Sequence, residues 1–196
     1  MSETKTFFQL SGRGYAAATL SNATLLVIDA QEEYRSGVVR LPGLEAAMLQ
    51  IGRLLEAARA ANTPVVHVRH LGVPGGLFDP QGNRGQFLPE VAPLENETVI
   101  GKSLPNAFAN TGLAARLEEL GHLDLIVCGF MSHSSVSSTV RAAKDYGYRC
   151  TLVDDACATR DLPSAQGVIS ADTVHRAEMT VMADNFATVT FCDNLV

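Results

Sequence analysis

The sequence has few charged residues and no excess of positive ones. Of its 196 residues 18% are charged and 46% are apolar, and the formal net charge is −6. A protein that neutralises nucleic-acid phosphates needs a basic surface, so the acidic excess argues against a nucleic-acid partner. The apolar content excludes a disordered chain or a coiled coil and favours a densely buried α/β interior.

The sequence also lacks long apolar runs. The first twenty residues hold no stretch long enough for the hydrophobic part of a signal peptide, and no uninterrupted stretch could span a bilayer. We therefore expect a cytoplasmic protein without a membrane partner. The cysteines stand singly, with no C-x-x-C pair, which predicts reduced, buried thiols rather than disulfides or a zinc knuckle. They are Cys128, Cys150, Cys157 and Cys192.

The length suits one well-packed unit, so we predict a single domain over residues 1–196. Dense apolar runs typical of strands covered on both faces lie at residues 24–29, 64–70, 123–129, 150–154 and 186–191. Segments with helical spacing separate these runs, marked by Leu44, Met48, Ile51 and Leu55, by Leu113, Leu117 and Leu120, by Val136, Val140 and Ala143, and by Val174, Val181 and Met182. This alternation predicts a three-layer α/β/α fold, with a doubly wound, mostly parallel, Rossmann-like sheet.

Ligands of such sheets bind outside the carboxyl ends of the strands, near the point where the strand order reverses. The stretch from Leu71 to Glu97 is rich in glycine and proline and is too long for a plain connection. We expect it to pass over that edge of the sheet.

Three features of the sequence fall at this edge. Asp29 ends the first apolar run, where it could be functional or could cap the next segment. Lys102 follows a short apolar pair in ETVIGKSLPNAF, although a lone lysine in a loop is usually just solvated. The segment GFMSHSSVSSTVRAA, residues 129–143, leaves a core strand and begins a helix whose backbone NH groups could hold a developing oxyanion.

The ordered set of these motifs resembles the isochorismatase-like cysteine hydrolase superfamily, through TLLVIDAQEEY, GKSLPNAF, GFMSHSSVSSTVRAA and GYRCTLVDDACAT. In that family the site is an Asp, a Lys and a Cys, which fall on Asp29, Lys102 and Ser135. The resemblance implies that Asp29 moves the proton, that Lys102 holds the pair charged, and that the NH groups of Met131 and Ser135 bind the oxyanion. The family commonly has a non-proline cis peptide in this turn, which would be Phe130–Met131.

Ser135 therefore stands where the family has its cysteine. A thiol has a pKa near 8.5 that a lysine and a helix start can lower, whereas a serine hydroxyl cannot be ionised in that way. Serine nucleophiles normally need a matched base. His133 is two residues away, and we interpret it as a pocket or interface residue.

Three hypotheses explain Ser135. The first is a deliberate Cys-to-Ser substitution. The second is a natural serine variant, or a relative of isochorismatase proper, which hydrolyses a vinyl ether without a cysteine. The third is a protein that binds its ligand without turnover. We favour the first, because Asp29 and Lys102 are intact. Cys157 lies near the same edge and could be considered as a substitute nucleophile. It is a weak candidate, because the NH groups that bind the oxyanion would not be aimed at it.

Other residues are candidates for contact with substrate. Gln31, in the family's D-x-Q position, could orient substrate or could be a buried structural amide. His70 at a strand tip could reach the pocket, and Tyr34, Phe78 and Phe108 could wall it or could simply be core. Metal-binding relatives carry an Asp and two His after the second strand, but this stretch supplies only His70 and Asp79, so we expect no metal and no cofactor.

The resemblance implies a metal-free hydrolase of a small amide or a related C–N bond, working as a homodimer or homotetramer. The alternative from another class is a binding or scaffold protein that keeps the fold without the chemistry. The sequence does not specify the substrate.

Overall fold

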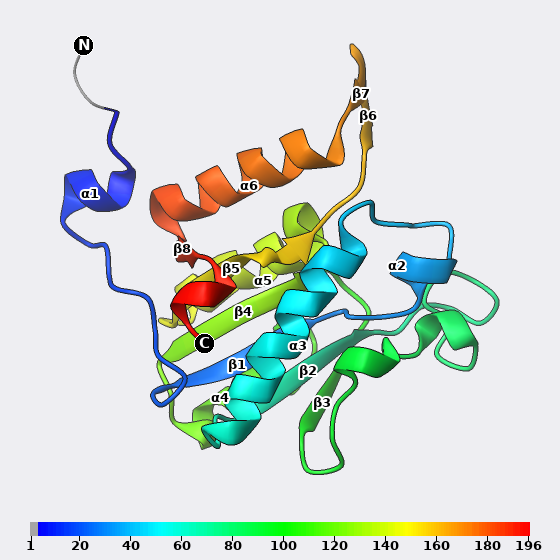
Figure 1. Ribbon diagram of the computed structural model, residues 1–196, viewed down its shortest axis with the longest axis horizontal. Helices are drawn as coiled ribbons and strands as arrows, with labels where there is room; N and C mark the ends of the chain where they lie inside the picture. The colour runs from blue at the N-terminus through cyan, green and yellow to red at the C-terminus, as the bar shows by residue number, and fades with distance from the viewer. Residues whose placement is uncertain (1–3) are drawn as a thin grey trace.

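The computed structural model describes residues 4–196, and its centre is a six-stranded sheet in the order β3-β2-β1-β4-β5-β8 (Figure 1). Every neighbouring pair of strands in it is parallel. The strands are β1 (Ala23–Ile28), β2 (Val65–His70), β3 (Thr98–Lys102), β4 (Asp124–Phe130), β5 (Arg149–Ala158) and β8 (Ala187–Thr190). The predicted doubly wound, parallel sheet is confirmed. Residues 1–3 of the predicted domain lie outside the described residues.

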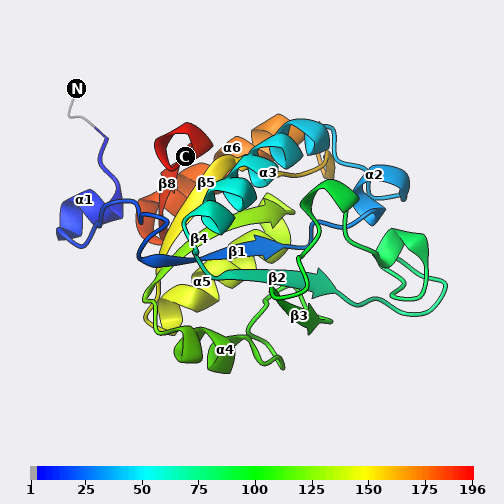
Figure 2. The same cartoon turned by 60° about the horizontal axis from the view of Figure 1, so that its bottom comes forward.

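Helices cover both faces of the sheet, as the apolar strands require. The helix α3 packs on one face, and α4, α5 and α6 pack on the other; Figure 2 shows α3 above the sheet and α4 and α5 below it. No helix within residues 4–196 is long and apolar enough to cross a membrane. The helices are α1 (Phe7–Ser11), α2 (Glu33–Ser36), α3 (Leu44–Ala60), α4 (Leu113–Leu120), α5 (Ser137–Asp145) and α6 (Ala171–Asn185).

Several elements differ from the sequence expectation. The strand β3 was not predicted, because its residues alternate between exposed and partly buried at the edge of the sheet. A small hairpin of β6 (Leu162–Ser164) and β7 (Gly167–Ile169) lies outside the main sheet and projects from the body (Figure 1). The predicted inner face of α6 was wrong in part: Met179 and Met182 are buried, whereas Val181 is 43% exposed. Because α6 covers only the β5–β8 side of the sheet, little of its surface needs to be apolar.

The strand order reverses between β1 and β4, and the two strands come very close at that point. Ile28 pairs with Gly129 in the last register position. A Cβ at Gly129, whose φ is +117°, would lie 2.1 Å from the carbonyl oxygen of Ile28. Only glycine fits here, and it brings the turn after β4 against the end of β1.

The predicted excursion after β2 covers the carboxyl edge of the sheet. It contains two 3-10 turns, η1 (Asn83–Gly85) and η2 (Pro89–Val91), and it is joined to the segment after β1 by an antiparallel bridge between Gln31 and Phe87. In Figure 2 the arrows of β1 and β2 point toward α2 and this loop. The C-terminal turn η4 (Cys192–Asn194) lies on the α3 side of the core.

The loop reaches β3 through an ion-pair network on Glu97, whose side chain is 7% exposed. The Arg59 guanidinium donates to both Glu97 oxygens at 2.8 and 3.0 Å, and His67 Nε2 lies 3.0 Å from Oε2. His67 is therefore a fully buried core residue with a hydrogen bond to Glu97. Burial alone would raise the pKa of Glu97, but Arg59, the Leu94 amide and His67 outweigh it and lower the pKa to about 2.

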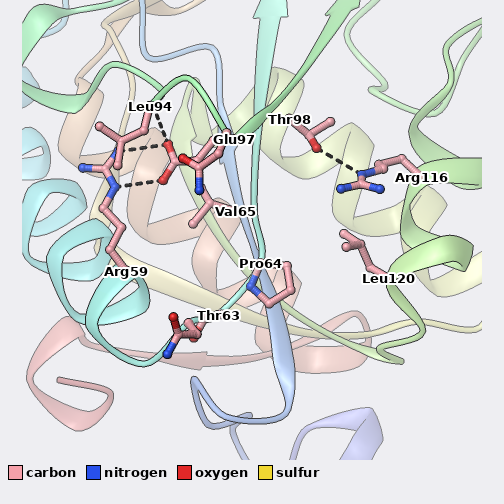
Figure 3. A pocket seen from close by; sticks show the side chains of 11 residues that line it. Arg59, Thr63, Pro64, Val65, Leu94, Glu97, Thr98, Arg116 and Leu120 are labelled. Atoms are coloured by element: carbon pink, nitrogen blue, oxygen red, sulfur yellow. Dashed lines mark hydrogen bonds and ion pairs between the residues drawn. The ribbon is translucent and has the colours of Figure 1, made fainter.

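These residues border a pocket of about 340 Å³ at the amino ends of β2 and β3 (Figure 3). Its lining includes Arg59, Pro64, Glu97, Thr98 and Arg116, and the Arg116 Nε donates to Thr98 Oγ1 at 3.0 Å. This is the opposite edge of the sheet from Asp29 and Lys102. The network therefore anchors the start of β3, whose other end carries the lysine.

We expect Glu97→Gln to lower the free energy of unfolding by about 2 kcal/mol at pH 7, because it leaves the partly buried Arg59 without its carboxylate. The pKa of Glu97 is about 2 in the fold and 4.5 ordinarily, so its contribution is present above pH 4.5 and is lost as the pH falls toward 2. Urea unfolding between pH 7 and pH 3 should show a shallower decline for the variant than for the unsubstituted protein. The exposed Glu95→Gln is the control, and equal losses in the two variants would contradict the role of the network.

Candidate active site

The three predicted catalytic side chains meet at the carboxyl edge of the sheet. Lys102 Nζ lies 2.7 Å from Asp29 Oδ2 and donates to Ser135 Oγ at 3.1 Å. All three residues are buried: Asp29 is 1% exposed, Lys102 2% and Ser135 6%. Residues far apart in the sequence therefore form one compact, nearly dry cluster.

The ends of three strands place these side chains. Asp29 directly follows β1 and has a left-handed φ of +51°, while its NH donates to the Val68 carbonyl at 2.9 Å. An aspartate tolerates this conformation better than most residues, and here it aims the carboxylate away from the strand's path. Lys102 is the last residue of β3 and pairs in register with His70.

Ser135 lies in a π-helix, η3 (Ser132–Val136), that links β4 to α5. The peptide Phe130–Met131 is cis, as the resemblance implied. The Met131 carbonyl accepts from the NH groups of Ser134 and Val136, at 3.0 and 3.3 Å, on either side of Ser135. Such single π turns inside helices often occur at functional sites.

The Asp29 carboxylate is held mainly by the charge of Lys102. Burial raises its pKa, and the Lys102 ammonium and the Ser135 hydroxyl oppose that rise. Within residues 4–196 neither carboxylate oxygen of Asp29 has a hydrogen bond of acceptable geometry. A buried carboxylate in this condition has a strong tendency to take up a proton.

His70 completes the surroundings of the lysine. Its Nδ1 lies 3.2 Å from Lys102 Nζ, and burial followed by the lysine charge lowers the pKa of His70 to about 4. At neutral pH the ring is therefore uncharged, and its Nδ1 accepts a hydrogen from the ammonium. Lys102 Nζ thus lies close to Asp29, His70 and Ser135 at once.

This arrangement defines where protons can move. Because Lys102 donates to Ser135 Oγ, the hydroxyl must direct its own hydrogen elsewhere, and Asp29 is the adjacent acceptor. Transfer of that hydrogen would leave a negative oxygen next to the ammonium. The geometry suits activation of a nucleophile at position 135, but a serine hydroxyl is a far weaker acid than a thiol and gains less from it.

The structure also locates the predicted substrate contacts. Gln31 is fully buried: its Nε2 donates to the carbonyls of His70 and Gly85 at 3.0 and 2.9 Å, and its Oε1 accepts from the His70 NH at 2.8 Å. Of the two roles considered for Gln31, orienting substrate or serving as a buried structural amide, these contacts favour the second. The side chain ties the loop after β2 to the end of that strand. Tyr34 and Phe78 pack edge to face with ring centres 5.2 Å apart, and Phe78 meets His70 at 5.1 Å. Tyr34 and Phe78 thus form a buried aromatic wall next to His70, the residue that contacts Lys102.

Two predicted contacts point away from the cluster. Phe108 is a correction: it stacks on Tyr146 and Tyr148, at the far end of α5, because the chain after β3 runs down that helix. His133 Nδ1 bonds Thr159 Oγ1, at the end of β5, and does not contact Ser135. Burial, with the nearby charge of Arg160, lowers the pKa of His133, and the contact with Thr159 in place of Ser135 argues against a role as the base for Ser135.

The remaining polar candidates are occupied or inert. The Asp79 carboxylate accepts from the NH groups of Gly75 and Gln81, which keeps it within its own loop and away from His70. Across residues 4–196 no group of three or more His, Cys, Asp or Glu side chains is arranged to hold a metal ion. All four cysteines are buried, and burial raises the pKa of the Cys128 and Cys157 thiols.

Sequence reasoning missed Glu33, which organises the wall. Its side chain is fully buried, with Oε1 accepting from the Val38 NH at 3.0 Å and Oε2 accepting from the Phe78 NH at 3.3 Å. In the run QEEY no feature of the sequence distinguishes Glu33 from the neighbouring Glu32. Only the following Gly37, where a Cβ would lie 2.0 Å from Glu33 Oε1, hints at a packed side chain.

We expect Lys102→Met to lower the free energy of unfolding by roughly 3–5 kcal/mol at pH 8, because it leaves the Asp29 carboxylate buried without its cation. The pKa of Asp29 is raised above its ordinary 3.8, so its contribution is complete below that pH and is lost as the pH rises through the folded value. The variant should therefore be more stable at pH 5 than at pH 8 in urea unfolding. The double variant with Asp29→Asn should recover much of the loss, and a pH-independent loss would contradict a buried ion pair.

Comparisons with known proteins agree with the fold and with the motifs. The isochorismatase domain model matches residues 23–192. A crystal structure of an isochorismatase from Pseudomonas putida KT2440 is 61% identical, covers 99% of this chain and 100% of its own, and superposes with a TM-score of 0.97. The isochorismatase family protein YddQ of Bacillus subtilis is 41% identical over 168 residues, 84% of this chain and 93% of that one. A more distant relative, the maleamate amidohydrolase of Pseudomonas putida, is 29% identical over 153 residues, 69% of this chain and 72% of that one. The chain belongs to the isochorismatase family of hydrolases.

Proposed function

We propose that this protein's site is built to hydrolyse a C–N bond of a small amide or related substrate, through a nucleophile at position 135. The observation that carries the proposal is the buried Asp29–Lys102 pair, with Lys102 Nζ 3.1 Å from the side-chain oxygen of residue 135. Neither Asp29 oxygen has a hydrogen bond of acceptable geometry within residues 4–196, so the carboxylate is available to exchange a proton with residue 135.

With a cysteine at position 135 the reaction proceeds in balanced steps. The thiol gives its proton to Asp29, and the sulfur attacks the carbonyl carbon, so that a tetrahedral oxyanion forms beside the NH groups of Met131 and residue 135. Asp29 returns the proton to the leaving nitrogen, an amine or ammonia departs, and a thioester remains. Water, deprotonated by Asp29, then releases the acid and restores the thiol.

The name of a relative supports this choice of bond. The maleamate amidohydrolase of Pseudomonas putida is an amide hydrolase by name. Tyr34 and Phe78 pack together, and Phe78 contacts His70 beside the lysine, so bulky side chains crowd the cluster, which favours a small substrate. The solved relative with the highest identity reported above is called an isochorismatase, so the family name alone does not select the bond.

Ser135 is best explained as a substitution of the family's cysteine that weakens the chemistry. The surrounding machinery is complete, because the ion pair, the π turn and the neutral His70 are all in place. A protein that had lost its chemistry would have no reason to keep a cation and a carboxylate buried together at a cost in desolvation.

A second candidate rests on the raised pKa of Asp29. Burial raises the pKa of Asp29 above its usual range, which favours the protonated carboxyl, and vinyl-ether hydrolysis of the isochorismatase type needs a proton donor and no thiol. In that case Ser135 would be the native residue and would serve only to position Asp29 and Lys102.

Comparison with Ser135→Cys separates these possibilities. We expect the variant to release ammonia from members of a panel of small amides at least about a thousandfold faster than the serine form, since the thiolate supplies most of the nucleophilic advantage. Iodoacetamide should label residue 135 rapidly in the variant, and the four buried native cysteines should react slowly.

Ser135→Ala in the same assays is the matched control, with the pocket kept and no nucleophile present. On a vinyl-ether substrate, activity in the serine form that Ser135→Cys does not improve, and that Ser135→Ala retains, would favour the vinyl-ether chemistry. A Ser135→Cys thiol that is neither labelled rapidly nor active on any amide would support a scaffold and defeat the proposal.

A further inference from the structure

A second set of polar side chains lies behind the turn that carries Ser135. Ser132, the first residue of the π-helix η3, has its Oγ 3.1 Å from His175 Nδ1, and His175 Nε2 lies 3.1 Å from Asp154 Oδ1. His175 belongs to α6 and Asp154 to β5. None of these residues takes part in the contacts of Asp29, Lys102 and Ser135.

The order serine, histidine, aspartate is that of a hydrolytic triad, but the burial excludes that role. Ser132 is 0% exposed, and its hydroxyl is turned toward α6. A nucleophile must reach a substrate carbon, and no substrate can approach an oxygen enclosed in this way. The cluster must act on the protein itself.

The hydrogen positions follow from the chemistry of the partners. A carboxylate can only accept, so His175 Nε2 carries a hydrogen for Asp154, and in the neutral ring Nδ1 is then an acceptor. The Ser132 hydroxyl therefore donates to His175. Asp154 fixes the tautomer, and the tautomer fixes the direction of the serine hydroxyl.

A second bond from the same helix holds the other end of the turn. Glu178, one helical turn after His175, accepts from Ser137 Oγ at 2.5 Å, and Arg141 bonds both groups at 3.1 and 3.2 Å. Ser132 and Ser137 stand three residues before and two residues after Ser135. The helix α6 is itself fixed by Met179 and Met182, which are buried in the core.

We propose that His175 is a positioning residue for position 135. By holding Ser132, it fixes the start of the π-helix and hence the direction of the side chain and backbone NH of residue 135 relative to Lys102 and Asp29. It touches no substrate. The inference rests on the proposed function, because it concerns the same nucleophile.

Two amide substitutions, both made in the Ser135→Cys protein, separate this positioning role from a purely structural one. In His175→Asn the amide can take the place of Nδ1 and keep the bond to Ser132, whereas in His175→Gln it takes the place of Nε2 near Asp154 and loses Ser132. His175 also lines an open cavity of about 380 Å³, so a smaller side chain adds to that space rather than leaving a sealed void. Arg176→Ala, at an exposed neighbouring position of α6, is the control.

The readouts are the rate of iodoacetamide labelling at residue 135, kcat and KM on an amide, and the Tm. We expect His175→Gln to slow labelling and kcat by roughly tenfold to a hundredfold with KM little changed, and His175→Asn to stay within about threefold of the parent, because misplacement of a reacting group acts on kcat. Asparagine is a poorer helix former than glutamine. If the loss of labelling rate and kcat came only from lower stability, His175→Asn would therefore be more impaired than His175→Gln.

Equal effects of Asn and Gln, an effect on KM alone, or a loss that tracks Tm would overturn the inference. If the His175 variants do not fold, Ser132→Ala removes the same bond from the other side and should slow labelling to the same degree, while an unchanged rate would overturn the inference. Slow labelling in the Ser135→Cys parent would instead count against the proposed function, so the two failures are distinguishable.

Discussion

The site depends on one costly interaction, the burial of the Asp29 carboxylate against the Lys102 ammonium. Two charges that are 1% and 2% exposed repay their desolvation only if they are held at close range, here 2.7 Å. That distance requires two strands that are not neighbours, β1 and β3, to end at matching heights, with His70 on β2 between them. In the proposed reaction the pair would activate a nucleophile at position 135, because it offers a proton acceptor and a cation at the same point.

Much of the remaining structure can be understood as support for this pair. Gly129 lets β4 approach Ile28 closely enough to bring the π turn to Asp29. Gln31 and Glu33 bond the loop after β2 so that it covers the edge and excludes water, which strengthens the electrostatic interactions beneath it. At the other end of β3, Glu97 anchors the strand to α3 through Arg59. Strand ends and the π-helix thus hold Asp29, Lys102 and Ser135, and the loop after β2 covers them.

The family resemblance was enough to predict that Asp29, Lys102 and Ser135 come together, and the apolar runs predicted most of the sheet. Asp29, Lys102 and Ser135 each sit in a short pattern tied to a strand end, and buried parallel strands are visible as apolar runs. The edge strand β3 was missed because two of its five residues are exposed and two are only partly buried, so it forms no dense apolar run. Phe108 was misplaced, and the choice between two roles for Gln31 stayed open, because the direction of a side chain in a connection depends on long-range packing. The contacts of His175 with Ser132 and Asp154 join three segments that no local pattern relates.

The ionisation of a thiol at position 135 tests the central claim most directly. In Ser135→Cys the ultraviolet absorbance of the thiolate can be followed against pH, and the buried native thiols should add little, since burial raises the pKa values of Cys128, Cys150 and Cys157. The account predicts that the new thiol titrates well below its ordinary pKa of about 8.5, and that Lys102→Met in the same protein removes the shift. A thiol at position 135 that titrates at its ordinary value or above, with or without Lys102, would contradict a site built to activate a nucleophile there.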